Sequence, residues 1–189
     1  MRGFDHFGWI APWYDRHAHQ EKPEELLRLV EMPPQGRLLD AGGGAGNIAG
    51  YFAGGETQVV VADISWGMVR LAGAKKGVRA ICAAAESLPF SGDYFDRVVM
   101  VDAFHHVLNQ SLTANELWRV LKPGGWIVIE EPDIRSGWVK LTALAEKLLL
   151  MRSHFVKPDV IASFFQVEPA DRAIKIQGDT AWVVIKKRG

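Results

Sequence analysis

The chain has 189 residues, of which 48% are apolar and 23% charged, so it can bury the core of an ordinary globular domain. Its 22 Lys and Arg residues balance 22 Asp and Glu residues, and zero net charge provides no general attraction to nucleic acid or anionic membranes. Cys82 is the only cysteine, which excludes a disulfide framework and a thiolate metal site.

No apolar run reaches the length of a membrane span, and the N-terminal residues lack the apolar core of a signal peptide. We therefore expect a single cytoplasmic domain over residues 1–189, with no membrane span and no nucleic-acid partner.

Short β-branched runs alternate with helical patterns, which is typical of a parallel sheet covered by helices. In chain order, the predicted elements are helix 23–32, strand 37–40, helix 46–53, strand 59–62, helix 65–76, strand 78–83, strand 95–101, helix 112–121, strand 126–130, and helices 140–154 and 158–165. Two final strands, 172–177 and 180–186, flank a Gly178-Asp179 turn and form a hairpin. The pattern predicts an α/β, Rossmann-like, doubly wound sheet of seven mostly parallel strands with an antiparallel C-terminal hairpin.

A glycine-rich turn, Asp40-Ala41-Gly42-Gly43-Gly44-Ala45-Gly46, follows the first predicted strand. Open α/β sheets bind ligands beyond the carboxyl ends of their strands, and glycines allow a ligand to approach the backbone closely. The dinucleotide fingerprint G-x-G-x-x-G would place its third glycine at Asn47, so the spacing D-x-G-x-G-x-G fits that ligand poorly. A tight structural turn without a ligand is the alternative.

Asp63 ends the second predicted strand. A carboxylate at this place can accept hydrogen bonds from both hydroxyls of a ribose. Aspartate also caps strands and begins turns, so a structural role remains open. Together with the glycine turn, Asp63 favours a nucleoside ligand without identifying it.

Three later segments follow in order: residues 84–90 (AAESLPF), 95–101 (FDRVVMV) and 121–125 (LKPGG). Their combination with the glycine turn and Asp63 resembles the class I methyltransferases that depend on S-adenosylmethionine (SAM). The resemblance is strongest to the type 11 group, which is related to ubiquinone and menaquinone biosynthesis enzymes. The motifs cover about residues 4–125, and the remainder agrees in its order of elements.

This resemblance implies that SAM is the methyl donor and S-adenosylhomocysteine the product. It assigns cofactor binding to Tyr14, Asp40, Ala41, Gly42, Gly44, Asp63, Ile64, Ala85, Glu86 and Asp102. Asp63 would hold the ribose, Ile64 would lie against the adenine, and Ala85 would donate its N–H to the adenine ring. Many relatives have Asp where this chain has Ala84, so the exocyclic amine of the adenine would need a different hydrogen-bond acceptor here.

The fourth predicted strand ends at the same sheet edge, in Asp102-Ala103-Phe104-His105-His106. Methyl transfer from a sulfonium depends mainly on alignment, and a base is needed only when the acceptor must lose a proton. His105 or His106 could be that base, or both could be structural. No metal is expected, because adjacent histidines point in different directions and no third ligand is evident.

Glu130, Glu131 and Asp133 follow the fifth strand and could contact the acceptor or act as a second base; surface acidity is the alternative.

Residues 1–22 are rich in aromatic side chains and are predicted to form a lid, or a strap packed on the core. Residues 136–165 are predicted to form a helical insertion beside the acceptor. Its apolar residues could line an acceptor pocket, or could be explained by core packing. These residues are Trp138, Leu141, Leu144, Leu148, Met151, Phe155, Phe164 and Phe165.

The sequence thus predicts methyl transfer from SAM to a small-molecule acceptor, with an apolar, quinone-like or lipid-like acceptor as the narrower hypothesis. A SAM-binding regulatory protein without catalysis is the alternative. An NAD(P)-dependent oxidoreductase is disfavoured by Asn47 and by the later motifs.

Overall fold

The computed structural model describes residues 23–137, 139–140, 153–165 and 170–189. Tyr14, the predicted lid over residues 1–22 and most of the predicted helix 140–154 lie outside the described residues. The strands are β1 (Arg37–Ala41), β2 (Gln58–Asp63), β3 (Val78–Cys82), β4 (Phe95–Val101), β5 (Leu121–Pro132), β6 (Ala170–Gln177) and β7 (Thr180–Lys187). The helices are α2 (Glu24–Val30), α3 (Asn47–Phe52), α4 (Trp66–Gly73), α5 (Gln110–Val120) and α7 (Pro158–Ser163).

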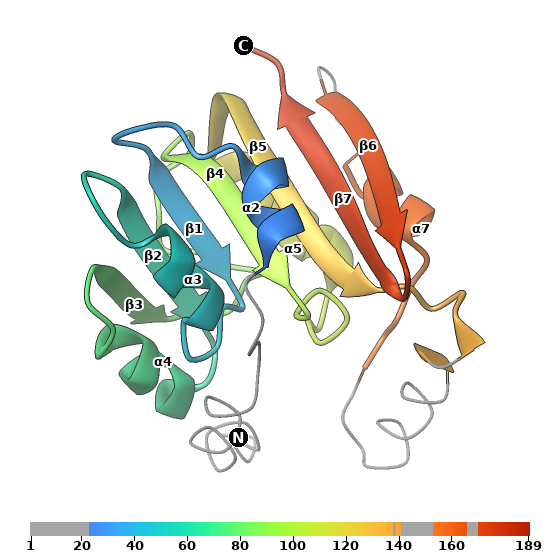
Figure 1. Ribbon diagram of the computed structural model, residues 1–189, viewed down its shortest axis with the longest axis horizontal. Helices are drawn as coiled ribbons and strands as arrows, with labels where there is room; N and C mark the ends of the chain where they lie inside the picture. Colours follow the sequence, from blue (N-terminus) through green and yellow to red (C-terminus); the bar gives the residue numbers. More distant parts are fainter. Residues whose placement is uncertain (1–22, 138, 141–152, 166–169) are drawn as a thin grey trace.

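The seven strands form one sheet in the order β3-β2-β1-β4-β5-β7-β6 (Figure 1). The first five in this order are parallel, whereas β7 runs antiparallel to both β5 and β6. This arrangement confirms the predicted doubly wound sheet and its C-terminal hairpin. Strand order reverses between β1 and β4, which is where open α/β sheets bind their ligands.

Two apolar clusters cover the two faces of the sheet. Neighbouring residues in β1 face opposite sides: Leu38 packs with α2, α3 and α4, and Leu39 packs with α5 and α7. Both side chains are fully buried, which explains why these two adjacent positions of the strand are both apolar rather than alternately apolar and polar. Among the described residues, no helix combines the length and apolarity needed to cross a bilayer.

Capping side chains set the starts of α4 and α5. Ser65 accepts a hydrogen bond from the Met68 N–H at 3.4 Å, as the sequence suggested. Asn109 accepts from the Leu112 N–H at 3.0 Å, so α5 begins two residues before its predicted start.

Strand β5 begins at Leu121, earlier than the predicted start at residue 126. Its pairing with β4 shifts register between Phe95 and Arg97. This bulge accommodates the Pro123-Gly124-Gly125 segment without ending the strand.

The predicted helix 140–154 does not extend to its C-terminal end, because residues 153–157 are not helical. The His154 N–H donates to the His105 carbonyl at 2.7 Å, and the His154 carbonyl accepts from the Gln110 side chain at 2.9 Å. These long-range partners take the backbone groups that a continuing helix would have used. The segment is thereby joined to the loop after β4.

Replacing Leu117 tests the packing between α5 and the sheet, because this side chain is fully buried there. We expect Leu117→Ala to lower the free energy of unfolding by about 2–5 kcal/mol, because it removes buried apolar contacts and leaves a cavity. Chemical denaturation monitored by circular dichroism measures this loss. Leu112→Ala is the matched control, since Leu112 lies on the same helix but is 51% exposed; equal losses in the two variants would contradict the assigned packing.

A candidate active site at the carboxyl ends of the strands

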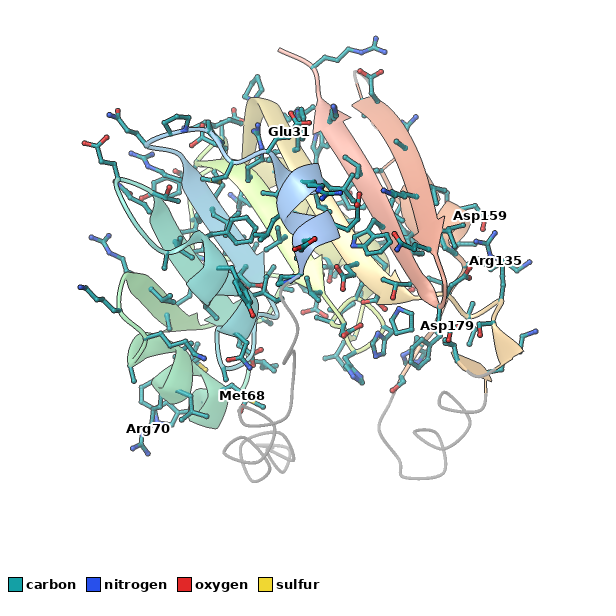
Figure 2. The ribbon with its side chains drawn as sticks, viewed as in Figure 1. Glu31, Met68, Arg70, Arg135, Asp159 and Asp179 are labelled. Atoms are coloured by element: carbon teal, nitrogen blue, oxygen red, sulfur yellow. The ribbon has the colours of Figure 1, made fainter. Side chains whose placement is uncertain are left out.

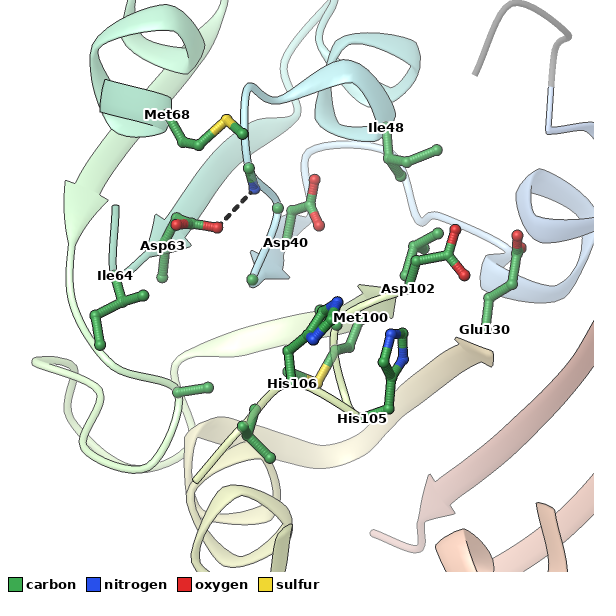
Figure 3. A pocket seen from close by; sticks show the side chains of 18 of the residues that line it. Asp40, Ile48, Asp63, Ile64, Met68, Met100, Asp102, His105, His106 and Glu130 are labelled. Atoms are coloured by element: carbon green, nitrogen blue, oxygen red, sulfur yellow. Dashed lines mark hydrogen bonds between the residues drawn. The ribbon is translucent and has the colours of Figure 1, made fainter. Parts of the chain in front are cut away.

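A cavity of about 860 Å³ lies at the strand-order reversal between β1 and β4 (Figure 3). Its volume is in the range of small-molecule and cofactor sites. Its walls are formed by the glycine turn, the ends of β2, β4 and β5, the segment after β3, and the turn between β6 and β7. Of the predicted site residues, those that line it are Asp40, Gly42, Gly44, Asp63, Ile64, Ala85, Glu86, Asp102, His105 and His106.

The glycine turn takes a conformation that side chains would obstruct. Gly42, Gly44 and Gly46 have φ angles of 68°, 53° and 76°. A Cβ atom on Gly42 would lie 2.7 Å from the Ala103 Cβ, so this position has no room for a side chain. The Gly42 N–H donates to the Ala62 carbonyl at 2.7 Å and holds the turn against β2. The exposed backbone beyond it can approach a ligand closely.

Asp40 lies beneath this turn and is only 1% exposed. Its Oδ2 accepts from the Ala49 N–H at 3.1 Å, while the buried Oδ1 has no hydrogen-bond partner among the described residues. Burial, with a contribution from the charge of Asp63, raises the pKa of Asp40 to about 7 even though the Ala49 N–H opposes the shift. A Cβ on Gly43 would lie 2.5 Å from the Asp40 Cγ, which explains why the turn can close over the carboxyl group.

Asp63 joins the glycine turn to the start of α4. Its Oδ2 accepts from the Gly44 N–H at 2.9 Å (Figure 3), and its Oδ1 accepts from the Ser65 N–H at 2.8 Å. A carboxylate accepts hydrogen bonds at both of its oxygens, which is the chemistry that ligand hydroxyls require. Ile64, the next residue, is 68% exposed beside the cavity. The ribose and adenine roles of these two residues stay predictions.

Ala84, Ala85 and Glu86 form the wall next to Ile64. One Glu86 oxygen accepts from the N–H groups of Leu108 and Asn109, at 2.7 Å and 3.2 Å. Glu86 therefore connects the segment after β3 to the start of α5, a structural role that the sequence did not indicate.

The turn after β4 presents the two histidines to the cavity (Figure 3). It begins at Asp102, which has the uncommon positive φ of 48° and donates its N–H to the Glu130 carbonyl at 3.0 Å. The His105 and His106 rings lie 4.0 Å apart. Burial and the neighbouring His105 lower the pKa of His106 to about 4, so His106 is neutral at physiological pH.

His105 is 4% exposed, and its Nδ1 lies 2.5 Å from the Oε2 of Glu131. The other oxygen of Glu131 accepts from the Ala103 and Phe104 N–H groups at 3.0 Å and 2.7 Å. Glu131, only 3% exposed, thus ties the end of β5 to the loop after β4. This finding corrects the alternative that it belongs to an acidic surface.

Glu130 and Asp133, which lie close to Glu131 in the sequence, have surroundings that differ from those of Glu131. Glu130 lines the cavity and accepts from the Trp182 indole N–H at 2.6 Å. Asp133 lies outside the cavity lining and pairs with Arg135 at 2.8 Å. Within the described ranges, no three His, Cys, Asp or Glu side chains are grouped to hold a metal ion.

The predicted apolar wall is only partly realised among the described residues. Phe155 lines the cavity and stacks on the His105 ring at 4.1 Å. Phe165, in contrast, is fully buried in the core, and Phe164 packs against Phe104, so the structure does not support these two as pocket residues. The rest of the predicted wall, Trp138, Leu141, Leu144, Leu148 and Met151, lies outside the described residues.

Sequence reasoning missed the hairpin turn as part of the site. Asp179 and Thr180 line the cavity, although they are more than a hundred residues from the glycine turn. Figure 2 shows Asp179 and Met68 near the same edge of the sheet, contributed by the β6–β7 turn and by α4. The Asp133 N–H donates to the Asp179 carbonyl at 2.7 Å and holds the turn there. No local signal marks this contact, because it arises from antiparallel pairing of β5 with β7.

Asp40 makes the stability of the ligand-free protein depend on pH. Its ordinary pKa of 3.8 applies to the unfolded chain and rises to about 7 on folding. The folded chain therefore retains a proton that the unfolded chain loses between these values, and stability falls as pH rises through this window. Asp40→Asn removes the effect, so we expect the variant to gain stability relative to the unmodified protein from pH 4 to pH 8, by on the order of 4 kcal/mol at most. Chemical denaturation across this range measures the difference, and parallel stability profiles would contradict the burial of an ionisable group here.

Comparison with known proteins agrees with this geometry. Residues 39–129 match the family model described as "Methyltransferase domain" (Methyltransf_11). The ubiquinone/menaquinone biosynthesis C-methyltransferase UbiE of Coxiella burnetii is 37% identical over 105 residues, which cover 50% of this chain and 42% of that protein. The chain thus spans less than half the length of this relative.

Solved structures match over nearly the whole chain. A chain from the complex between the Haloferax volcanii Trm112 methyltransferase activator and a methyltransferase superposes with a TM-score of 0.80, at 18% identity, covering 98% of this chain and 99% of that one. A SAM-dependent methyltransferase from Thermotoga maritima gives 0.79 at 19% identity, covering 96% and 98%. At these identities the likeness establishes the fold. Residues 39–129 thus match the methyltransferase domain of the type 11 group, and the fold of the chain is that of the class I SAM-dependent methyltransferases.

Proposed function

We propose that this protein binds SAM in the cavity over the glycine turn and transfers its methyl group to a small-molecule acceptor. The observation that carries the proposal is the hydrogen bond between the Gly44 N–H and Asp63, 2.9 Å long, at the edge of a cavity of about 860 Å³. This hydrogen bond connects the glycine turn, whose backbone a ligand can approach closely, with a carboxylate that is suited to bind a ribose. Both residues lie within the segment that matches the methyltransferase domain.

The described residues fit SAM in size and chemistry. Asp63 would hold the ribose hydroxyls with its carboxylate, and Ile64 offers an exposed apolar side chain to the adenine. The buried Oδ1 of Asp40 is an acceptor without a partner among the described residues, directly beneath the turn that would carry the methionine portion. Bound SAM would supply an activated methyl group on a sulfonium.

The protein would contribute alignment and the exclusion of water. The cavity would limit how SAM and the acceptor are oriented, because the glycine turn and the loop after β4 face each other across it. Met100, Ala103 and Phe155 add apolar walls on the acceptor side. These side chains would keep water from the methyl group while an acceptor is held in line with it.

An apolar acceptor, quinone-like or lipid-like, is the narrower proposal. Ile48, Met68, Val107, Val139 and Phe155 line the cavity and favour an acceptor with apolar surface. The name of the Coxiella burnetii relative points to the same class of molecule.

A SAM-binding regulatory protein without catalysis is the second candidate. Ala84 favours it, because this residue lines the cavity at a position where the resemblance to the methyltransferases leads us to expect Asp. Isothermal titration with SAM beside an assay for S-adenosylhomocysteine formation separates the two. We expect both SAM binding and acceptor-dependent product formation with a panel of quinols, phenols and fatty-acid derivatives. Binding without turnover would favour the regulatory protein, and binding of NAD(H) in place of SAM would overturn both candidates.

Asp63→Ala tests the cofactor site. We expect the Kd for SAM to rise at least about tenfold, because the variant loses charge-assisted hydrogen bonds to the ribose and releases the Gly44 N–H. Isothermal titration measures the Kd. Cys82→Ser is the matched control, since Cys82 pairs with Asp63 in the β2–β3 register and lies outside the cavity lining. If the Asp63 variant stayed within twofold of the unmodified protein, the ribose site would be wrongly assigned.

A further inference from the structure

Strand β6 is the last strand of the sheet, and within the described part of the chain no strand pairs with its outer side (Figure 1). It pairs with β7 in one continuous register from Ala170 to Gln177, without a bulge. Every residue after Ala170 is exposed, including Ile174 and Ile176, whose exposed fractions are 42% and 44%. A regular, exposed edge strand with apolar side chains is a surface to which another strand can pair.

The turn between β6 and β7 determines which backbone groups of β6 point outward. Gln177 and Thr180 flank this two-residue turn and form its closing pair. Hydrogen-bonded and non-hydrogen-bonded positions alternate along an antiparallel pair, so the odd-numbered residues of β6 direct their backbone groups toward β7. The even-numbered residues, which include both isoleucines, direct theirs to the outer edge. An added antiparallel strand would pair there.

The charges on one face of β6 are complementary to those of a second copy. Asp171, Ala173 and Lys175 alternate with the isoleucines and share the face on the side of α2, where Lys175 lies 2.6 Å from Glu25. Two antiparallel copies of β6 centred on Ala173 would place Asp171 of each chain directly opposite Lys175 of the other. Opposite charges at such cross-strand positions stabilise pairing, and alanine at the centre leaves room for the strands to approach.

The ion pairs that these charges make within one chain do not oppose the contact. Asp171 pairs with Arg188, and Lys175 pairs with Glu25; the Asp171 and Lys175 side chains are 54% and 47% exposed. Exposed ion pairs contribute little stability, so sharing or exchanging their partners costs little. Charges on an edge strand often prevent association. That protection fails when the neighbouring copy presents the opposite sign at the same position.

The other face of β6 supplies apolar contacts in the same register. Ile174 pairs with Val183 of β7, and Val183 belongs to the apolar cluster that packs with α5 and α7. The added strand would place Arg172 of the partner subunit opposite Ile174, and the methylene groups of an arginine can cover such a side chain. Pairing would therefore extend this cluster toward the second copy.

We propose that two copies of this chain form a symmetric dimer by antiparallel pairing of their β6 strands about Ala173, which joins the two sheets into one. The contact uses the same surface of both copies and closes after two. Because the two β6 strands run in opposite directions, the two cavities lie at opposite ends of the joined sheet and neither copy covers the cavity of the other. The inference is independent of the proposed methyl transfer.

Charge reversal tests the register. Sedimentation equilibrium at concentrations up to about 0.5 mM should show a monomer–dimer equilibrium for the unmodified protein. Lys175→Glu and Asp171→Lys each place like charges opposite one another at both ends of the contact, so we expect either variant alone to dimerise at least about tenfold more weakly. A mixture of the two variants restores opposite charges at both positions. Its heterodimer should have a Kd within about threefold of that of the unmodified dimer.

Glu25→Gln is the matched control, because it removes the partner of Lys175 within the chain and leaves β6 unchanged. It should alter the dimer Kd by less than about twofold. Circular dichroism verifies that each variant is folded, which the exposure of the substituted side chains favours. A dimer that both charge reversals leave intact, or a mixture that associates no more tightly than each variant alone, would overturn the proposal.

A disulfide gives the second readout, in a Cys82→Ser background because Cys82 is exposed. In the proposed register Ala173 lies opposite its own counterpart as a non-hydrogen-bonded pair, with Cα atoms about 4.5 Å apart and within reach of a disulfide. We expect Ala173→Cys to form a covalent dimer on mild oxidation. Ile176→Cys is the control, because its counterpart lies several residues away along the partner strand. Equal cross-linking of the two variants, or a monomer at the highest concentration, would contradict the dimer.

Discussion

Parallel pairing of β1 with β2 on one side and β4 on the other determines where the functional groups of this protein lie. Asp40 is in register with Val61 of β2 and with Val99 of β4, so all three strands end at the same edge. Each connection must then cross over a face of the sheet, and β1 and β4 leave their shared edge in opposite directions. The cavity is the space between these diverging turns.

The two sides of the cavity are stabilised in different ways. On the cofactor side, the contacts come from segments close in sequence: Asp63 bonds Gly44 and Ser65, and Asp40 bonds Ala49. On the acceptor side, Glu131 reaches back to the loop after β4, and His154 bonds the backbone of His105. The cofactor side is therefore encoded locally, whereas the acceptor side depends on the whole sheet being assembled.

Buried carboxyl groups organise both sides, but they face different surroundings. Asp40 has one oxygen without a partner among the described residues, and its pKa rises because burial disfavours the charged form. Glu131 accepts from two backbone N–H groups and lies 2.5 Å from the Nδ1 of His105, and these contacts compensate its burial. A buried carboxyl group with spare acceptor capacity is suited to receive a ligand, whereas the contacts of Glu131 hold the loop after β4 against the end of β5.

The sequence by itself determined the order of elements, the sheet class, the conformation of the glycine turn and the segment that carries the methyltransferase motifs. These features follow from local causes: apolar runs mark buried strands, and the spacing of Gly42 and Gly44 reflects a backbone with positive φ angles at both positions, which glycine adopts most readily. The approximate ends of most strands could be predicted for the same reason, whereas the longer β5 depended on its bulge against β4.

Only the tertiary structure decided how Glu130, Glu131 and Asp133 differ. Glu130 and Glu131 are neighbours in β5 and point to opposite faces, whereas Asp133 follows the strand and pairs with Arg135. It also brought Asp179 to the cavity and placed Phe165 in the core. Such contacts join residues far apart in the chain, and no spacing in the sequence records which strands become neighbours.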